Sequence, residues 1–288
     1  MNRARLIINA DDFGWSRSIT DGILRSHEDG IVTSTSLLAN QPASEYAISQ
    51  IPRVPRLGIG IHLNLCSGAP VLPAEQVPSL VGSDGNFLPA PEMRFRLARW
   101  RVSSREIEAE FGAQIRWVRE RGVKISHADA HYGVNVFPIA VMPFRRAVQR
   151  EGITCIRPVC HTVSPRNGLV PRVHAESLFR QLAVDAYMRT LRLSAFRRLT
   201  SPDFMVLVLS PGQRRDIRRQ REGWQTAIEN LRPGTYSAVC HPGLNGAELR
   251  DIDNLRDSRE IELGIMTDPG LRSAIQRCGV ELINYHEL

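Results

Sequence analysis

The chain has 288 residues, of which 42% are hydrophobic and 23% charged, and these proportions are typical of a globular protein and exclude a disordered chain. Its formal net charge is +7, but the basic residues are almost all arginine and are spread along the chain, so we interpret the charge as compositional bias. Because no zinc-finger spacing or RNA-binding signature accompanies this charge, no nucleic-acid partner is expected.

Eight segments have the apolar, β-branched composition of strands, and helical patterns separate most of them. In chain order they are residues 6–10, 32–39, 57–65, 124–131, 154–159, 204–209, 235–241 and 280–285. Alternating strands and helices predict an α/β fold with a parallel sheet. Eight strands favour a closed (β/α)8-type barrel over an open sheet.

Helix signals lie between and after these strands. The segment from Ser104 has apolar residues at 3,4 spacing, and a helix from Pro143 is expected to stop at Gly152. Ser258 begins another predicted helix, and Asp268 before Pro269 is typical of a helix N-terminus.

Two stretches interrupt this alternation, residues 66–103 and residues 160–202. We expect both to be long loops that leave strand ends and shape a substrate cleft on the barrel rim. No internal repeat or linker is found, so residues 1–288 are predicted to form a single domain.

The compartment is predicted from cysteine usage and apolar runs. Five cysteines without a CxxC pair indicate neither a disulfide framework nor a cysteine zinc site. No signal-peptide pattern is found, and no apolar run approaches the ~20 residues that span a bilayer, so a cytoplasmic location is expected. The arginine-rich stretch 189–222 is interpreted as a solvated helix face, with a membrane-surface or polyanion site as the alternative.

Polar side chains gather at the ends of four predicted strands. They are Asp11 and Asp12 after the first strand, His62 in the third, His127, Asp129 and His131 in the fourth, and His241 in the seventh. Any one of them has an ordinary structural interpretation, since aspartates are common in turns and a lone histidine is often a core residue. Because parallel strand ends share one rim, their coincidence predicts a polar site there.

One carboxylate and two imidazoles from separate strands would suit a catalytic divalent ion that keeps a position for water. Neighbouring residues of a strand point to opposite faces, so the two adjacent aspartates are expected to do different work. We predict that Asp12 binds the metal and that Asp11 takes a proton from the water.

Four motifs make a family resemblance specific: NADDFGWSRSITDGILRSHEDGIVTSTSLLAN, GIGIHLNLCSGAPVLP, SHADAH and CHPG. In this order and spacing they resemble the YdjC-like carbohydrate deacetylases, which include chitooligosaccharide deacetylases and deacetylases of hopanoid biosynthesis. The resemblance extends to the closing TDPGLRSAIQRCGVELINY and is looser over residues 66–103 and 160–230. It implies a distorted β/α barrel that removes acetyl groups from N-acetylated sugars with a divalent metal.

The resemblance also implies residue roles. It places the family's metal ligands on Asp12, His62 and His131, and its proposed base on Asp11. It favours His131 over the other histidine of the HADAH motif. The remaining members of that motif, His127 and Asp129, would then orient the ligands.

Four further residues are candidates near this site. His241 is the candidate acid that protonates the departing amine. Arg157 is expected to hold Asp11 ionised or to contact substrate, with an ordinary salt bridge as the alternative. Trp15 and Tyr132 are placed to stack on a sugar face.

One departure from the family leaves alternatives open. Many relatives have a histidine two places after the ligand position, where this chain has Gly133. We expect the protein to be an enzyme that cleaves an acetylated sugar or glycolipid. The alternatives that this departure leaves open are a metal-dependent hydrolase of another ester or amide and a non-catalytic sugar-binding barrel. The ion is Mg²⁺ or Zn²⁺, and a homodimer is compatible with the sequence.

Overall fold

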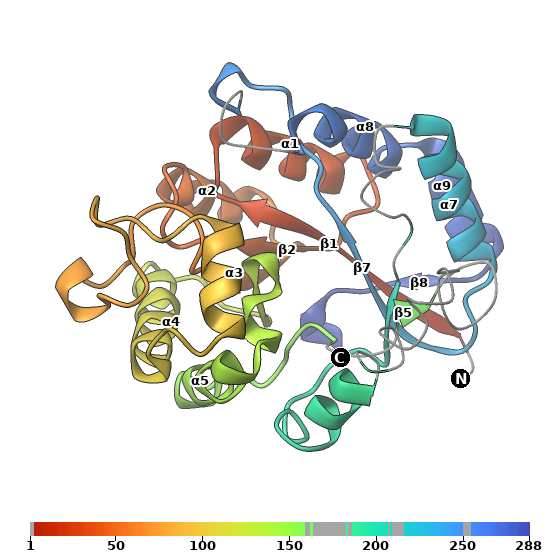
Figure 1. The fold of residues 1–288 in the computed structure, drawn as a ribbon. Helices are drawn as coiled ribbons and strands as arrows, with labels where there is room; N and C mark the ends of the chain where they lie inside the picture. Colours follow the sequence, from red (N-terminus) through yellow and green to blue (C-terminus); the bar gives the residue numbers. More distant parts are fainter. Residues whose placement is uncertain are drawn as a thin grey trace.

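The structure, a computed structural model, describes residues 3–158, 162–163, 183, 186–206, 208, 216–249 and 255–288. A parallel sheet of eight strands lies at its centre, and helices surround the sheet (Figure 1). The strands are β1 (Ala4–Phe13), β2 (Ser34–Leu37), β3 (Gly58–Leu63), β4 (Ala128–Ala130), β5 (Thr162–Val163), β6 (Phe204–Val206), β7 (Gly234–Cys240) and β8 (Glu281–Leu282). Their order is β4-β3-β2-β1-β7-β6-β5, and β8 also pairs with β1. The predicted α/β fold, a distorted TIM-like barrel, is confirmed.

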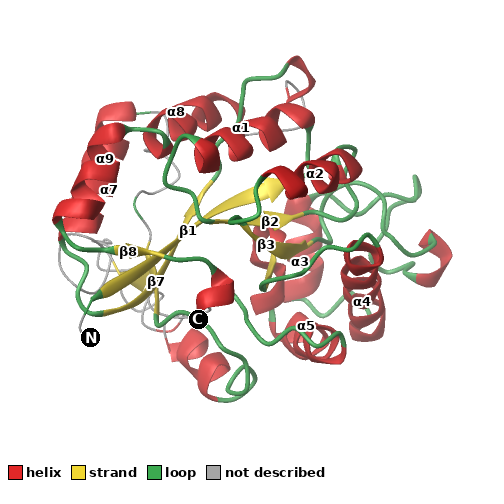
Figure 2. Ribbon diagram, turned by 180° about the vertical axis from the view of Figure 1, so that it is seen from behind, coloured by secondary structure: helices red, strands yellow, loops and turns green. Residues whose placement is uncertain are grey.

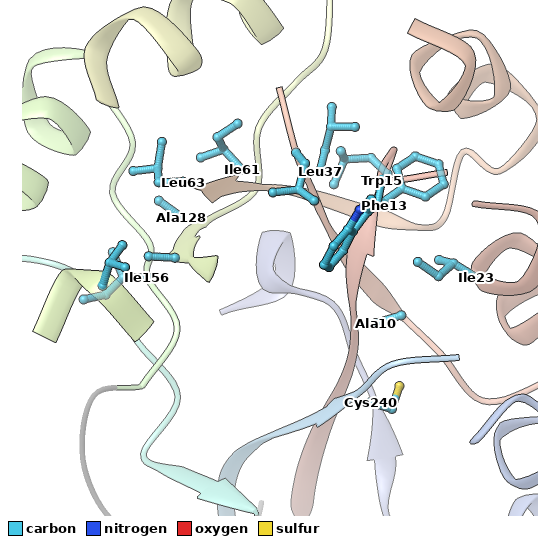
Figure 3. Packing of buried hydrophobic residues seen from close by; sticks show 14 of the residues in the cluster. Ala10, Phe13, Trp15, Ile23, Leu37, Ile61, Leu63, Ala128, Ile156 and Cys240 are labelled. Carbon is cyan, nitrogen blue, oxygen red and sulfur yellow. The ribbon is translucent and has the colours of Figure 1, made fainter. Parts of the chain in front are cut away.

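Strand β1 is the centre of the sheet. It pairs with β7 from Ala4 to Ala10 and with β2 from Asn9 onward. Helices and neighbouring strands cover both of its faces, which explains its continuous run of apolar residues. Buried side chains of β1, β2, β3 and helix α1 meet in one hydrophobic cluster, which includes Phe13, Leu37 and Ile61 (Figure 3).

The helices follow the strands along the chain and lie outside the sheet (Figure 2). They are α1 (Arg17–Glu28), α2 (Ser44–Gln50), α3 (Ala90–Ala98), α4 (Ser104–Glu120), α5 (Pro138–Arg150), α7 (Ile217–Glu229), α8 (Arg256–Met266) and α9 (Pro269–Arg277). The predictions of α4 and α9 are confirmed, and the Asp268 side chain caps α9 by accepting a hydrogen bond from the Gly270 N–H.

Two predicted helix starts are wrong by a few residues. Helix α5 begins at Pro138 rather than Pro143, because proline suits the first helical position, where its missing N–H costs nothing. Pro143 lies inside the helix. Helix α8 begins at Arg256, two residues before Ser258.

The strand predicted at residues 154–159 is present only as a short segment that bridges its neighbours on both sides. Its described residues form only single bridges, between Ile156 and Ala128 and between Cys155 and Thr200. Pro158 has no N–H with which to continue a ladder, so the pairing cannot extend toward it. The strand β5, which was not predicted, lies beyond this segment.

The stretch 66–103 follows β3, but it is not all loop, because α3 lies within it. Met93 and Leu97, four residues apart, are fully buried and pack this helix on the core. Helix α3 contacts α5 and the short 3-10 segment η3 (His131–Val136). Most of the other predicted loop, residues 160–202, lies outside the described residues, and its described part includes helical residues 186–193.

In α7, Arg218 and Arg219 of the arginine-rich stretch are exposed, which fits both the predicted solvated face and its surface-binding alternative. None of the described helices has the length and apolar character needed to cross a bilayer. Four described cysteines carry no disulfide: Cys66, Cys155, Cys240 and Cys278.

Candidate active site

The two adjacent aspartates at the end of β1 point to the same place, contrary to the alternation expected of a regular strand. The pairing of β1 with β2 shifts register between Ala10 and Phe13, and Asp12 has a left-handed backbone with φ of 74°. As a result, Asp11 Oδ2 lies 3.9 Å and Asp12 Oδ1 3.8 Å from Nε2 of His62. A bulge that re-aims a side chain, and a strained backbone that costs on the order of 1 kcal/mol, are typical of functional sites.

Asp12, His62 and His131 form a compact cluster of donor atoms. His131 Nδ1 lies 3.2 Å from Asp12 Oδ1 and 3.3 Å from His62 Nε2, and one donor atom of each residue lies within 4.8 Å of the others. Asp12 comes from β1, His62 from β3, and His131 directly follows β4. All three are buried. The three residues that the sequence analysis predicts as metal ligands therefore lie together in one potential cation site.

One oxygen of this cluster has no hydrogen-bond partner. Asp12 Oδ1 is buried and lies 3.2 Å from His131 Nδ1, and it has no hydrogen-bond partner among the described residues. A buried carboxylate oxygen is costly unless it is bonded or binds a metal. The orphaned oxygen and the two imidazole nitrogens beside it fit a divalent cation.

Asp129 fixes the orientation of His62. Nδ1 of His62 donates to Asp129 Oδ1 at 2.6 Å, and the Ser36 hydroxyl donates to Asp129 Oδ2 at 2.7 Å. This leaves Nε2 of His62 facing the cluster, the arrangement that carboxylates impose on metal-binding histidines. Burial alone would lower the pKa of His62, but Asp129 and Asp11 outweigh it and raise the pKa above its usual value.

Arg157 joins Asp11 to Asp129. It donates to Asp11 Oδ2 at 2.8 Å and also contacts Asp11 Oδ1 and Asp129 Oδ2, while the Asn9 amide donates to Asp11 Oδ1 at 2.8 Å. Burial would raise the pKa of Asp11, but Arg157, with His62, holds that pKa below its usual value. The contact between Arg157 and Asp11 that the sequence suggested is present.

Arg259 is a site residue that sequence reasoning missed. This arginine of α8 is fully buried, donates to Asp12 Oδ2 at 2.8 Å and lies over the Trp15 ring at 5.6 Å. Burial would raise the pKa of Asp12, but Arg259, with His131, holds it well below its usual value. Gly243 of the CHPG motif leaves room for this arginine, since a Cβ there would lie 3.0 Å from the Arg259 Cδ.

His241 faces the site from the end of β7. Its Nε2 lies 3.9 Å from Asp11 Oδ2, and its backbone N–H donates to Glu262 Oε2 at 2.6 Å. Glu262 Oε2 also lies 3.9 Å from His241 Nδ1. Glu262 was missed in the sequence as well, and it lies three residues after Arg259 on α8, so one helix face supports both His241 and Asp12.

His127 lies one step further from the cluster. Its ring stacks on Tyr285 with centroids 3.6 Å apart, and its Nδ1 lies 2.9 Å from the Ser126 hydroxyl. Its Nε2 lies 3.7 Å from Asp129 Oδ2, and burial lowers its pKa. The ring passes so close to Gly60 that a Cβ there would lie 2.2 Å from it, which explains the glycine in GIGIHL.

Trp15 and Tyr132 both pack against His131, at ring-centroid distances of 5.1 Å and 4.3 Å. Trp15 is 7% exposed and belongs to the hydrophobic cluster, so its ring is covered by protein. Tyr132 is 39% exposed and follows His131 in a left-handed conformation with φ of 52°. Of the two candidate stacking residues, Tyr132 is therefore the one whose ring is open to a ligand.

The charges of the site leave a place for a cation. Three buried carboxylates face two guanidiniums, which leaves one negative charge in excess when the imidazoles are neutral. The carboxylates are Asp11, Asp12 and Asp129, and the guanidiniums are Arg157 and Arg259. The arrangement can bind a divalent cation beside an ionised carboxylate and a histidine, which are the groups that hydrolysis with proton transfer requires.

These features define a parallel α/β barrel with a potential metal centre on its rim. The sequence profile of YdjC-like proteins matches residues 5–277, and the chain belongs to this family. A carbohydrate deacetylase of Geobacillus stearothermophilus is 31% identical over 98% of this chain and 96% of its own length. A carbohydrate deacetylase of Halalkalibacterium halodurans is 38% identical over 51% of this chain, and that alignment covers 60% of the relative.

The fold is also that of a solved structure. A protein of Enterococcus faecalis V583, provisionally described as a cellobiose-phosphate cleavage protein, superimposes with a TM-score of 0.79. The comparison covers 100% of this chain and 99% of that protein, at 25% sequence identity.

Proposed function

We propose that this protein is a metal-dependent hydrolase that removes the N-acetyl group from an acetylated sugar, either free or carried by a glycolipid. The observation that carries the proposal is the buried, unbonded Asp12 Oδ1 beside His62 Nε2 and His131 Nδ1. The names of the two carbohydrate deacetylases similar to this chain support the choice of substrate class.

Asp12, His62 and His131 would hold the ion. A divalent ion bound there would polarise the acetamide carbonyl and acidify the attacking water, so that even a weak base would suffice. Two of the three donors are imidazole nitrogens, which suit Zn²⁺ better than Mg²⁺, an ion that prefers oxygen ligands. We therefore expect Zn²⁺ to bind more tightly, and the ion that supports the faster turnover is a separate measurement.

Asp11 would accept the proton of the attacking water. Arg157 keeps this carboxylate ionised, and Asp11 Oδ2 faces both His62 and His241 at 3.9 Å. The water oxygen forms a bond to the acetyl carbon while one of its protons passes to Asp11. A carboxylate with a lowered pKa is a weak base, but it is fully available at neutral pH.

His241 would then protonate the departing amine nitrogen. Its Nε2 lies 3.9 Å from Asp11 Oδ2, and Glu262 fixes its backbone. As the bond between the acetyl carbon and the nitrogen breaks, the nitrogen takes a proton and leaves as the sugar amine, and acetate remains. Tyr132, exposed beside His131, is placed to stack on the sugar ring.

Acetate release tests the proposal directly. The protein is treated with a chelator and assayed on N-acetylglucosamine, its short oligomers and N-acetylglucosaminyl lipids, with Zn²⁺ or Mg²⁺ added back. We expect acetate and free amine in equal amounts only when an ion is present. Release of phosphate or of another acyl group instead would favour a hydrolase of a different ester or amide, and sugar binding without any product would favour a non-catalytic barrel.

A further inference from the structure

Two residues after its last helical residue, helix α3 has a tryptophan where three other helices have a glycine. Helices α4, α5 and α9 are each followed, two residues after their last helical residue, by a left-handed glycine: Gly122, Gly152 and Gly279. Trp100 takes the same position after α3, with φ of 58°. Glycine is the usual residue there because a side chain strains a left-handed backbone.

This tryptophan is strained and exposed at once. Three described residues other than glycine have a positive φ, and two of them, Asp12 and Tyr132, belong to the candidate active site. The third, Trp100, is 64% exposed, and Phe95, five residues earlier, is 50% exposed. Backbone strain is typical of functional positions, and an indole open to water gains nothing for the fold.

Arginines surround the two exposed rings. The guanidiniums of Arg99 and Arg101 lie 5.3 Å and 5.6 Å from the centre of the Phe95 ring. Arg96 pairs with Glu92 at 2.7 Å, and Glu92 is the sole acidic residue between positions 90 and 101 of the sequence. The end of α3 therefore presents aromatic rings and unbalanced positive charge together.

We propose that Phe95, Arg99, Trp100 and Arg101, which we name the α3 patch, dock this protein on an anionic lipid surface. Tryptophan rings favour the region between lipid headgroups and acyl chains, and arginines bind lipid phosphates. A neutral sugar would not require this charge, and a second copy of the chain would present the same positive patch across a two-fold axis. The inference goes beyond the proposed function and does not depend on it.

Docking through the α3 patch would place the candidate site near the lipid. Helix α3 contacts η3, the segment that begins with His131 and carries Tyr132 (Figure 1). A lipid surface held by α3 would therefore lie on the side of the barrel where the exposed Tyr132 ring marks the rim.

Vesicle co-sedimentation of the full chain tests the proposal. We expect binding to vesicles of phosphatidylcholine mixed with phosphatidylglycerol, weak binding to phosphatidylcholine alone, and a decrease with salt. The decisive variant is Trp100→Gly, which places glycine at the position where it follows α4, α5 and α9. Its melting temperature should equal or exceed that of the parent, while vesicle binding should fall roughly tenfold.

Two matched controls separate the patch from general charge and general exposure. The Arg99→Gln/Arg101→Gln variant should lose roughly fivefold in binding per arginine, whereas Arg218→Gln/Arg219→Gln on exposed α7 should bind like the parent. Leu193→Ala, which removes a side chain that is 66% exposed elsewhere, should also have no effect. Acetate release from a soluble acetylated sugar should stay the same in Trp100→Gly, so this test and that of the proposed function fail separately.

Three results would overturn the proposal. One is a parent protein that binds neither kind of vesicle, and another is a Trp100→Gly variant that binds vesicles as well as the parent. The third is tighter binding to single-stranded DNA than to anionic vesicles, lost in Trp100→Gly, since aromatic rings and arginines also bind nucleic-acid strands.

Discussion

The two sides of the candidate site differ in how completely their carboxylates are bonded. On the Asp11 side, Arg157 contacts both oxygens and Asn9 adds a third bond. On the Asp12 side, Arg259 donates a hydrogen bond to Oδ2, and Oδ1 has no hydrogen-bond partner among the described residues. Both aspartates are buried, both pair with an arginine, and both have lowered pKa values, so neither burial nor charge separates them.

In the proposed function, the number of hydrogen-bonded oxygens on each carboxylate assigns the roles. A carboxylate whose oxygens are already bonded must break those bonds to bind a metal, whereas one with a bare oxygen need not. Asp12 is therefore the ligand and Asp11 the proton acceptor in the proposed function. Variants of Asp12 or Arg259 change one side of the site, and variants of Asp11 or Arg157 change the other.

The largest effect is expected from Asp12→Asn. An amide at position 12 cannot supply the anionic oxygen, so the variant should lose its metal and all measurable turnover while remaining folded. Elemental analysis after dialysis measures the metal, and circular dichroism checks the fold. His62→Ala and His131→Ala should behave in the same way, and full metal content in these variants would refute the ligand assignment.

Asp11→Asn should slow the reaction without removing the metal. Loss of a general base lowers the rate by ~10² to 10⁴-fold, and the amide keeps the shape of the carboxylate. Substrate affinity should stay near normal, and the acidic limb of the pH-rate profile should disappear. An Asp11→Asn protein emptied of metal as thoroughly as Asp12→Asn would show that the two roles are reversed.

Arg259→Met should weaken metal binding by ~10 to 100-fold, because it frees Asp12 to rotate. Breaking a buried ion pair should also cost about 3–5 kcal/mol of unfolding free energy in the metal-free protein. Arg157→Met is the matched variant on the other side. It should change the pH-rate profile more than the metal affinity, which titration with Zn²⁺ measures for both proteins.

Local sequence signals were enough for much of the fold and for the donor set. The apolar run of β1, the 3,4 spacing of α4 and the Asp268–Pro269 start of α9 are short-range patterns, and the structure contains all three elements. His62 and His131 could be placed near Asp12 because parallel strands end on one rim. That inference requires only strand order and direction, which sequence patterns predict.

The missed features depend on contacts between distant residues. Arg259 lies in a helix whose charged residues are typical of an exposed face. Only its hydrogen bond with Asp12, 247 positions away, reveals its role. The bulge at Asp12 arises from a register shift against β2, which no local pattern encodes. The strand expected around Ile156 is reduced to two bridges because Pro158 limits the pairing, a signal that was available in the sequence.

His127→Ala should have a milder effect than any change to the ligands. His127 Nε2 lies 3.7 Å from Asp129 Oδ2 and 3.3 Å from the Ser36 hydroxyl oxygen, so His127 acts on the ligands through these two residues, and its ring stacks on Tyr285. We expect a rate loss of about tenfold with metal content retained. A complete loss of metal in this variant would place His127 among the ligands.

The smallest effect concerns the pH dependence of stability in the metal-free protein. Their folded pKa values lie below the usual value of 3.8, so both stabilise the fold at neutral pH and lose that contribution as the pH falls below about 4. Asp11→Asn and Asp12→Asn should therefore each flatten this acid limb.

The histidine acts in the opposite direction. The pKa of His62 is raised above 6.5, so its contribution is present below pH 6.5 and is lost as the pH rises through the folded pKa. A metal requires the neutral imidazole, so added Zn²⁺ should stabilise the protein more above this pKa than below it. Urea unfolding across the pH range measures both limbs, and equal stabilisation by Zn²⁺ at all pH values would show that His62 is not a ligand.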